Sequence, residues 1–150
     1  MDLQINKNNP TIMHVDLNSC FATVEQQANP HLRGKPFVIA AYTTPNGCIV
    51  APSIEAKRFG IKVGMTVRKA RLLYKDVIVR DPDPELVRDV HIKFVKIFKS
   101  YSPFVYPKSI DEVVVEFKGA PAFKRGLVNI GFDIKKRLRM EVGEWISCNI

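Results

Sequence analysis

The first clear pattern in the chain is an alternation of apolar and polar residues across 11–18, TIMHVDLN. Met13, Val15 and Leu17 fall on one side of this segment. Successive side chains of a β-strand point to opposite faces, so the alternation predicts a strand with one face in the core. The opposite side ends in Asp16, which places a carboxylate at the end of a core strand.

A mixed region of short elements follows this strand. Residues 19–29 predict a helix with Ser19 as its capping residue, because a serine hydroxyl can accept a hydrogen bond from a free helix amide. The segments expected next are strands at 35–42 and 47–53, short helices at 53–61 and 66–74, and a strand at 76–79. The pair Asn46-Gly47, between the two strands, is typical of a tight turn.

The longest helical pattern begins after Asp83, with Pro84 at its first position. Its apolar stripe consists of Leu86, Val90, Phe94, Ile97 or Phe98, and Tyr101. The segments expected beyond it are a hairpin across 104–117, a helix across 126–140 with Leu127, Ile130, Ile134 and Leu138 on one face, and a strand at 145–150. Helices mixed with a hairpin predict an α+β fold rather than a doubly wound sheet.

The composition is that of a globular protein, with 46% hydrophobic residues in a chain of 150. The formal net charge of +8 favours binding to polyanions, with nucleic acid first and an anionic membrane surface second. No apolar run is long enough to span a membrane, and the polar start at residues 1–10 does not resemble a secretory signal. The three cysteines, Cys20, Cys48 and Cys148, have no CxxC spacing and predict reduced thiols in a cytoplasmic protein.

Two adjacent acids, Asp111 and Glu112, stand at the start of the second hairpin strand. Neighbouring side chains on an ideal strand point apart, but directly after a turn both acids could lean toward one ion. Asp16 would complete a set of three carboxylates. Spacing alone leaves a second interpretation open, in which Asp111 and Glu112 are surface acids of the hairpin and Asp16 is a capping residue.

Three converging carboxylates would raise one another's pKa and destabilise the fold unless a cation lay between them. Oxygen ligands favour Mg²⁺, Ca²⁺ or Mn²⁺ over zinc, and Mg²⁺ usually takes its remaining ligands from water and substrate phosphates. Two such ions a few Å apart are a standard arrangement for phosphoryl transfer.

Four motifs occur in the order HVDLNSCFATVE, NPHLRGKPFVI, SIEAKRFGIKVGM and YSPFVYPKSIDEVVVEF. In order and spacing they resemble the Y-family (DinB/UmuC-type) translesion DNA polymerases, from about His14 to the end of the chain. The resemblance implies a discontinuous palm at 1–19 and 81–150, with a mostly antiparallel sheet and helices on one face. It implies a small fingers subdomain at 20–80, and a chain that stops before the thumb and little finger.

The resemblance implies that Asp16, Asp111 and Glu112 are the catalytic carboxylates and hold two Mg²⁺ ions, with Mn²⁺ as a possible substitute. The backbone carbonyl of Leu17 matches a further metal ligand. Phe21 matches the steric-gate aromatic, whose ring would clash with the 2′-hydroxyl of a ribonucleotide.

The incoming dNTP is expected to contact backbone amides around Cys20 and Phe21, together with Ser53 and Lys57. The segment SIEAK matches the family's YEAR motif with two changes. Ile54 replaces a tyrosine and loses a hydroxyl donor. Lys57 replaces an arginine, which keeps the charge and loses the two-pronged guanidinium. Ala51, at a position often occupied by threonine, removes another hydroxyl.

The function that these features predict is template-directed DNA synthesis of the translesion type, in DNA damage tolerance and repair. The expected partners are primer-template DNA, dNTP and, through a downstream region, a sliding clamp, without a membrane. Two alternatives remain open at this level. One is a polymerase-like recruitment module of weak activity, suggested by the changed phosphate-binding residues. The other is a nucleotide cyclase-like enzyme with a similar palm.

Overall fold

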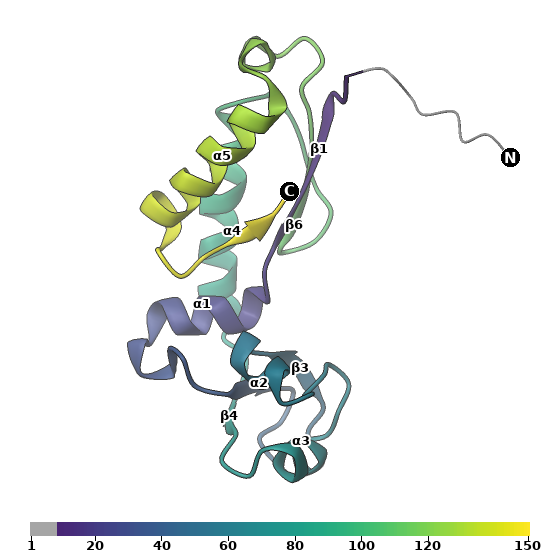
Figure 1. Ribbon diagram of the computed structural model, residues 1–150, viewed down its shortest axis with the longest axis vertical. Helices are drawn as coiled ribbons and strands as arrows, with labels where there is room; N and C mark the ends of the chain where they lie inside the picture. Colours follow the sequence, from purple (N-terminus) through teal and green to yellow (C-terminus); the bar gives the residue numbers. More distant parts are fainter. Residues whose placement is uncertain (1–8) are drawn as a thin grey trace, which may run out of the picture.

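The computed structural model describes residues 9–150, so most of the expected polar start lies outside the described residues. Two β-sheets occupy the two halves of an elongated molecule, one above the other in Figure 1. The larger sheet has the strand order β5-β6-β1-β7, and the smaller one has the order β3-β2-β4. The mixture of antiparallel strands and helices confirms the predicted α+β class.

The strands of the larger sheet are β1 (Ile12–Leu17), β5 (Phe104–Pro107), β6 (Glu112–Glu116) and β7 (Cys148–Asn149). Strand β1 lies in the middle and pairs antiparallel with β6, with Ile12 opposite Glu116 and Asp16 opposite Glu112. Met13, Val15 and Leu17 are all at most 4% exposed, which confirms the face predicted from the alternation. Asp16 therefore points to the other face of the sheet, at the end of the strand.

Helices α4 (Pro84–Lys99) and α5 (Leu127–Arg137) lie against one face of this sheet, as Figure 1 shows. The Asp83 side chain accepts a 3.0 Å hydrogen bond from the Leu86 amide and so caps α4 as predicted. Phe94 and Phe98 meet edge to face, with ring centroids 4.9 Å apart, inside the core. This packing fixes the sheet on which the acids stand.

The smaller sheet consists of β2 (Phe37–Ala40), β3 (Ile49–Pro52) and β4 (Ile78–Arg80). It packs with the short helices α2 (Ile54–Arg58) and α3 (Val67–Leu73). Strand β2 pairs antiparallel with β3 and parallel with β4. The predicted hairpin around Asn46-Gly47 and the short helices are confirmed.

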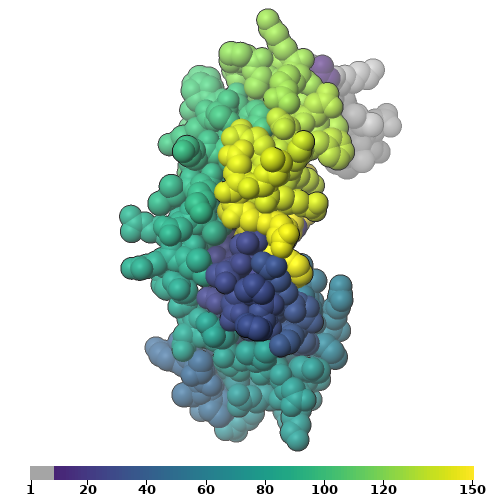
Figure 2. Space-filling model, turned by 90° about the vertical axis from the view of Figure 1, so that its left-hand side faces the viewer, coloured from purple at the N-terminus to yellow at the C-terminus, as the bar shows by residue number. Residues whose placement is uncertain are grey.

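Helix α1 (Cys20–Ala28) joins the two halves. Cys20 and Val24 belong to the core of the larger sheet, whereas Ala22 packs with Phe37 and Ile39 of the smaller one. Figure 2 shows this part of the chain, in dark blue, between the yellow C-terminal segment and the teal residues of the smaller half. A cavity at the start of α1 can therefore be lined by both halves.

Two sequence predictions need correction. Ser19 does stand at the N-cap position of α1, but its side chain makes no capping hydrogen bond, because its backbone is left-handed with φ 49° and ψ 44°. The final strand is also shorter than expected: β7 pairs with β1 only at Asp16 and Leu17. No helix in the described part of the chain is both long and apolar enough to cross a membrane.

Candidate active site

A polar cavity of about 250 Å³ lies where the end of β1, the start of α1, strand β3 and helix α2 meet. Six of the residues expected from the sequence line it: Asp16, Leu17, Cys20, Phe21, Lys57 and Asp111. Val50 and Val63 of the smaller half form an apolar part of its wall. Residues from distant parts of the chain thus share one concave site, as a substrate pocket requires.

Asp111 reaches this cavity because its backbone is fixed to β1. The Leu17 amide donates a 2.9 Å hydrogen bond to the Asp111 carbonyl, immediately before β6 begins. The Ser109 hydroxyl donates a 2.6 Å hydrogen bond to Oδ1 of Asp111 and so orients the carboxylate. The hairpin turn therefore presents Asp111 beside the end of β1, where Asp16 stands.

Glu112 lies directly opposite Asp16 in the strand register but does not line the cavity. Its Oε1 lies 2.8 Å from Nε2 of His14, two residues before Asp16 on the same face of β1, and the contact is an ion pair when the imidazole is protonated. The structure thus brings Asp16 and Asp111 into the cavity and places Glu112 at its border, paired with His14.

The acids act on one another electrostatically. The pKa of Asp16 is raised, first by burial and then by the negative charges of Asp111 and Glu112, while the positive charges of His14 and Lys57 oppose the rise. Burial, together with the negative charges of Asp111 and Asp16, raises the pKa of the Cys20 thiol to about 12, so this thiol stays protonated at neutral pH. Cys20 can therefore offer its backbone to a ligand but not a thiolate.

The site fits a divalent cation by its chemistry. Asp16 and Asp111 supply carboxylate oxygens, and burial, followed by the negative charges of Asp111 and Glu112, raises the pKa of Asp16 and so disfavours its charged form. A hard cation would stabilise the charged carboxylates, and Leu17 offers a backbone carbonyl in the same cavity. Within residues 9–150 no three His, Cys, Asp or Glu side chains are already gathered closely enough to hold a metal ion.

Phe21, at the start of α1, lines the cavity and is half-buried. Its ring packs against the cores of both halves of the molecule. An aromatic ring held from both sides is a fixed wall rather than a mobile side chain. This position suits a residue that sets the shape of the pocket.

Ser53 and Lys57, the two polar residues of the smaller half that were expected to contact the nucleotide, lie in different environments. Ser53 is fully buried and does not line the cavity: its hydroxyl accepts hydrogen bonds from the Ala56 and Phe37 amides and caps α2. Lys57 does line the cavity, and its Nζ donates a 2.7 Å hydrogen bond to Oγ of Ser19. Of the two, only Lys57 is placed to meet a ligand there.

Sequence reasoning missed two contacts of the site. His14 stands on the same strand face as Asp16, so the alternation could have indicated a cross-strand partner for Glu112. The contact between Ser19 and Lys57 had no local signal, because it depends on a left-handed backbone and on the packing of α2.

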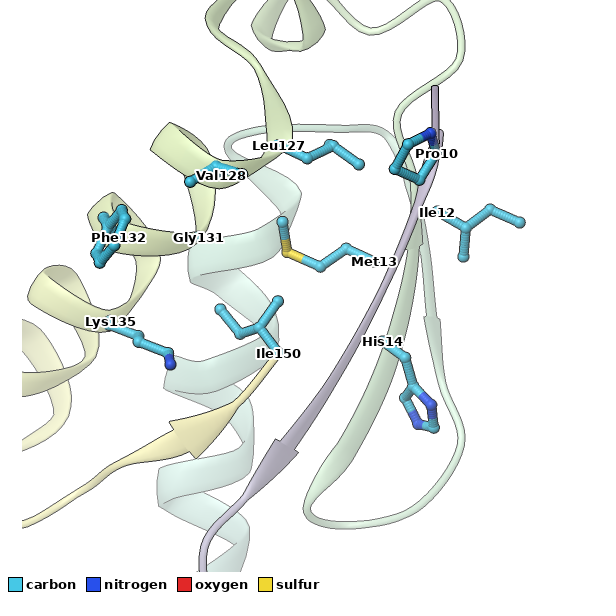
Figure 3. A pocket seen from close by; sticks show the side chains of 10 residues that line it. All are labelled: Pro10, Ile12, Met13, His14, Leu127, Val128, Gly131, Phe132, Lys135 and Ile150. Atoms are coloured by element: carbon cyan, nitrogen blue, oxygen red, sulfur yellow. The ribbon is translucent and has the colours of Figure 1, made fainter. Parts of the chain in front are cut away.

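A second cavity, of about 400 Å³, lies between the start of β1, helix α5 and the end of β7. Figure 3 shows its mostly apolar lining, including Met13, Leu127, Phe132 and Ile150. Among the described residues, no Asp or Glu side chain lines it. The candidate chemistry therefore belongs to the polar cavity.

Comparison with known proteins agrees with this geometry. The chain belongs to the impB/mucB/samB family, whose model matches residues 15–150. The matched range begins one residue before Asp16 and includes every candidate residue of the polar cavity.

Individual relatives carry the name DNA polymerase IV. The protein of Moorella thermoacetica is 36% identical over 135 residues, which are 89% of this chain and 34% of the relative. The protein of Pelotomaculum thermopropionicum is 34% identical over 93% of this chain and 34% of its own length. The chain thus spans about a third of the length of these relatives.

Solved structures show the same fold. A Y-family DNA polymerase chimera has a TM-score of 0.82 at 23% identity, over 91% of this chain and 40% of the other. DinB from Sulfolobus solfataricus has a TM-score of 0.81 at 24% identity, with the same coverage. These likenesses confirm the Y-family resemblance of the fold and extend over both halves of the molecule.

Proposed function

We propose that this chain forms the palm and fingers of a translesion DNA polymerase that adds a nucleotide to a primer 3′-hydroxyl. The observation that carries the proposal is the meeting of Asp16 and Asp111 with Phe21 and Lys57 in one cavity. The palm would consist of 1–19 and 81–150, and the fingers of 20–80. Membership in the impB/mucB/samB family favours this function over a nucleotide cyclase.

Residues on opposite sides of the cavity would contact different parts of a dNTP. Lys57 supplies a positive charge for the triphosphate, and the amides of Cys20 and Phe21 stand at the beginning of α1, where a helix favours anions. Asp16 and Asp111 face the same space from the larger sheet. The α-phosphate would thus lie between the cation of the fingers and the acids of the palm.

Asp16, Asp111, Glu112 and the Leu17 carbonyl would hold the metal, which we propose is a pair of Mg²⁺ ions replaceable by Mn²⁺. When bound, such ions lower the pKa of an attacking hydroxyl and neutralise charge on the phosphates. The protein orients the Asp111 carboxylate through Ser109 and fixes the Asp111 backbone through Leu17. Glu112 would exchange its partner His14 for the metal.

Phe21 would act as the steric gate. Its ring is fixed by packing on both sides, so it cannot move aside when a 2′-hydroxyl projects toward it. Discrimination would then come from a clash with the ribonucleotide rather than from a better contact with the deoxyribonucleotide.

The phosphate-binding residues of the fingers are reduced relative to the family pattern. Ile54 is 42% exposed and offers no hydroxyl, and Lys57 offers a single charged nitrogen. Ala51 lines the cavity without a polar group. We therefore propose weak retention of the triphosphate. The remaining proposed partners are primer-template DNA and a sliding clamp contacted by a downstream region, in the cytoplasm.

Primer extension tests this function. The chain is joined to the remaining length of the Moorella thermoacetica DNA polymerase IV, and extension of a primed template is measured with dNTPs and Mg²⁺. Asp111→Asn is expected to slow extension roughly a hundredfold or more, because it removes a charged ligand of the proposed metal site. Asp89→Asn, which neutralises an exposed acid of α4, is the matched control. Undiminished extension by the Asp111→Asn variant would sink the proposal.

The second candidate, a recruitment module of weak activity, is favoured by the changes at Ile54 and Lys57 alone. The same assay separates the two. A recruitment module would leave the wild-type fusion as slow as its Asp111→Asn variant.

A further inference from the structure

Ser19 is the only non-glycine residue with a positive φ in the described part of the chain, with φ 49° and ψ 44°. A left-handed backbone is unfavourable for a residue with a Cβ atom, and such residues concentrate where function requires them. Ser19 stands directly between β1 and α1 and lines the polar cavity. Its conformation therefore needs an explanation from the site.

The conformation directs the Ser19 hydroxyl away from its own helix. A serine at an N-cap normally accepts a hydrogen bond from a free amide of the first turn. Ser19 makes no such bond, and its Oγ instead accepts the 2.7 Å hydrogen bond from Nζ of Lys57. The chain thus forgoes a helix cap to form a contact with a residue 38 positions further along.

Lys57 stands in a cavity with two carboxylates and yet forms no ion pair with either. The ion pairs among residues 9–150 do not include Lys57, although Asp16 and Asp111 line the same cavity. Its positive charge is near enough to oppose the rise in the pKa of Asp16. The ammonium group of Lys57 therefore interacts electrostatically with Asp16, while its hydrogen bond is made to the neutral hydroxyl of Ser19.

We propose that Ser19 is a positioning residue that holds the Lys57 ammonium apart from Asp16 and Asp111. An ammonium paired with the carboxylates would occupy oxygens that the metal needs. It would also withdraw from the phosphates the one basic residue that lines the cavity within residues 9–150. Ser19 keeps both groups available. The identity of the phosphate ligand rests on the proposed function, whereas the placement of Lys57 does not.

This role suits a lysine. A guanidinium would be oriented by its own planar geometry, whereas an ammonium on a flexible four-carbon chain needs a partner to fix its position. Ser19 would supply that fixation without introducing a competing charge. The hydrogen bond from Lys57 to Ser19 would thus compensate in part for the loss of the arginine that the family motif has at this position.

The test uses the 150-residue chain and two measurements, the first being calorimetric binding of inorganic tripolyphosphate with Mg²⁺. Ser19→Ala is expected to weaken binding roughly three- to tenfold, since it removes one charged hydrogen bond. Ser19→Gly is expected to weaken it equally while keeping or raising the melting temperature, because glycine adopts φ 49° readily.

A Lys57→Met variant is expected to bind more weakly still, with no further loss on adding Ser19→Ala. Arg58→Met, next to Lys57 on the same helix but not among the residues that line the cavity, controls for charge.

The second measurement needs no ligand: a crystal structure of the Ser19→Ala variant is expected to show Lys57 Nζ within 4 Å of Asp16 or Asp111. Wild-type affinity in both Ser19 variants, or an unmoved Lys57, would overturn the positioning role and leave the proposed function intact. Absence of tripolyphosphate binding by the wild type would count against the proposed function. The shift of Lys57 in the crystal would then still decide the role of Ser19.

Discussion

The indole Nε1 of Trp145 donates a 2.8 Å hydrogen bond to Oε1 of Gln26, 119 residues earlier in the chain. Gln26 is 1% exposed, and its amide nitrogen donates to the Leu32 carbonyl at 3.3 Å and to Oε2 of Glu55 at 3.1 Å. One buried amide on α1 therefore connects the C-terminal part of the larger half to α2, the helix that carries Lys57.

Gln26→Leu is expected to destabilise the chain by about 2–4 kcal/mol. The substitution keeps the volume but removes the hydrogen-bond partner of the half-buried Trp145 nitrogen and of the Glu55 carboxylate, whereas the Leu32 carbonyl keeps the Lys35 amide as its partner. Urea unfolding measures the change. Val128→Ala, at a side chain that is 73% exposed, is the control and should change stability by less than about 0.5 kcal/mol. A Gln26 variant as stable as this control would show that the Gln26 hydrogen bonds do not contribute to the free energy of unfolding.

Asp16→Asn is expected to stabilise the metal-free chain at pH 7. Because the pKa of Asp16 is raised in the folded state, folding favours its protonated form, and stability falls as the pH rises from below the unfolded pKa through the folded one. The amide removes this loss, and the melting temperature should rise by roughly 1–3 °C at pH 7.

The same pair of proteins tests the fit of the cation. Mg²⁺ that binds the folded state alone should raise the melting temperature of the wild type and have a smaller effect on the Asp16→Asn variant. Equal melting temperatures at pH 7, with equal responses to Mg²⁺, would contradict the electrostatic account of the cavity.

Asp133→Asn is expected to weaken the dependence of stability on acid pH. The Tyr101 hydroxyl donates to Oδ2 of Asp133 at 2.8 Å and Arg125 donates at 2.9 Å, and these two bonds lower the pKa of Asp133. A lowered pKa stabilises the fold above the unfolded pKa, and this contribution disappears as the pH falls through the folded pKa. Thermal unfolding between pH 2 and pH 6 should therefore show a shallower slope in the variant, and an unchanged slope would refute the assignment.

Phe21→Ala is expected to increase the use of ribonucleotides relative to deoxyribonucleotides by roughly ten- to a hundredfold. The ring forms a fixed wall of the cavity, so its removal opens space for a 2′-hydroxyl. Single-nucleotide incorporation by the fusion protein, with rNTP and dNTP in parallel, measures the ratio. Phe21→Tyr, which keeps a ring of similar size, is the control. An unchanged ratio in the alanine variant would remove Phe21 from the gate.

The elements of the fold were largely predictable because their signals are local. The alternation of Met13, Val15 and Leu17 fixed β1 and its buried face, and Asp83 marked the start of α4. The meeting of Asp16 and Asp111 in one cavity depends on the pairing of β1 with β6, in which Asp16 lies opposite Glu112. The resemblance implied this meeting, and the spacing alone did not.

The details of the site depend on tertiary packing and could not be predicted from the sequence. Ser19 has the residue type of a helix cap, yet its left-handed backbone turns the hydroxyl toward Lys57. Ser53 resembles a ligand contact by position, yet the packing of α2 buries it completely. Glu112 belongs to the acidic pair in sequence, whereas a cross-strand contact holds it to His14.

The most direct test of the central claim is the position of a divalent ion in the polar cavity. Crystals of the chain grown with Mn²⁺ and a non-hydrolysable dNTP would give anomalous density from the metal. The account predicts a peak at coordination distance from both Asp16 and Asp111, with the triphosphate extending toward Lys57. Well-ordered crystals in which Mn²⁺ avoids both carboxylates while the nucleotide is bound would contradict it.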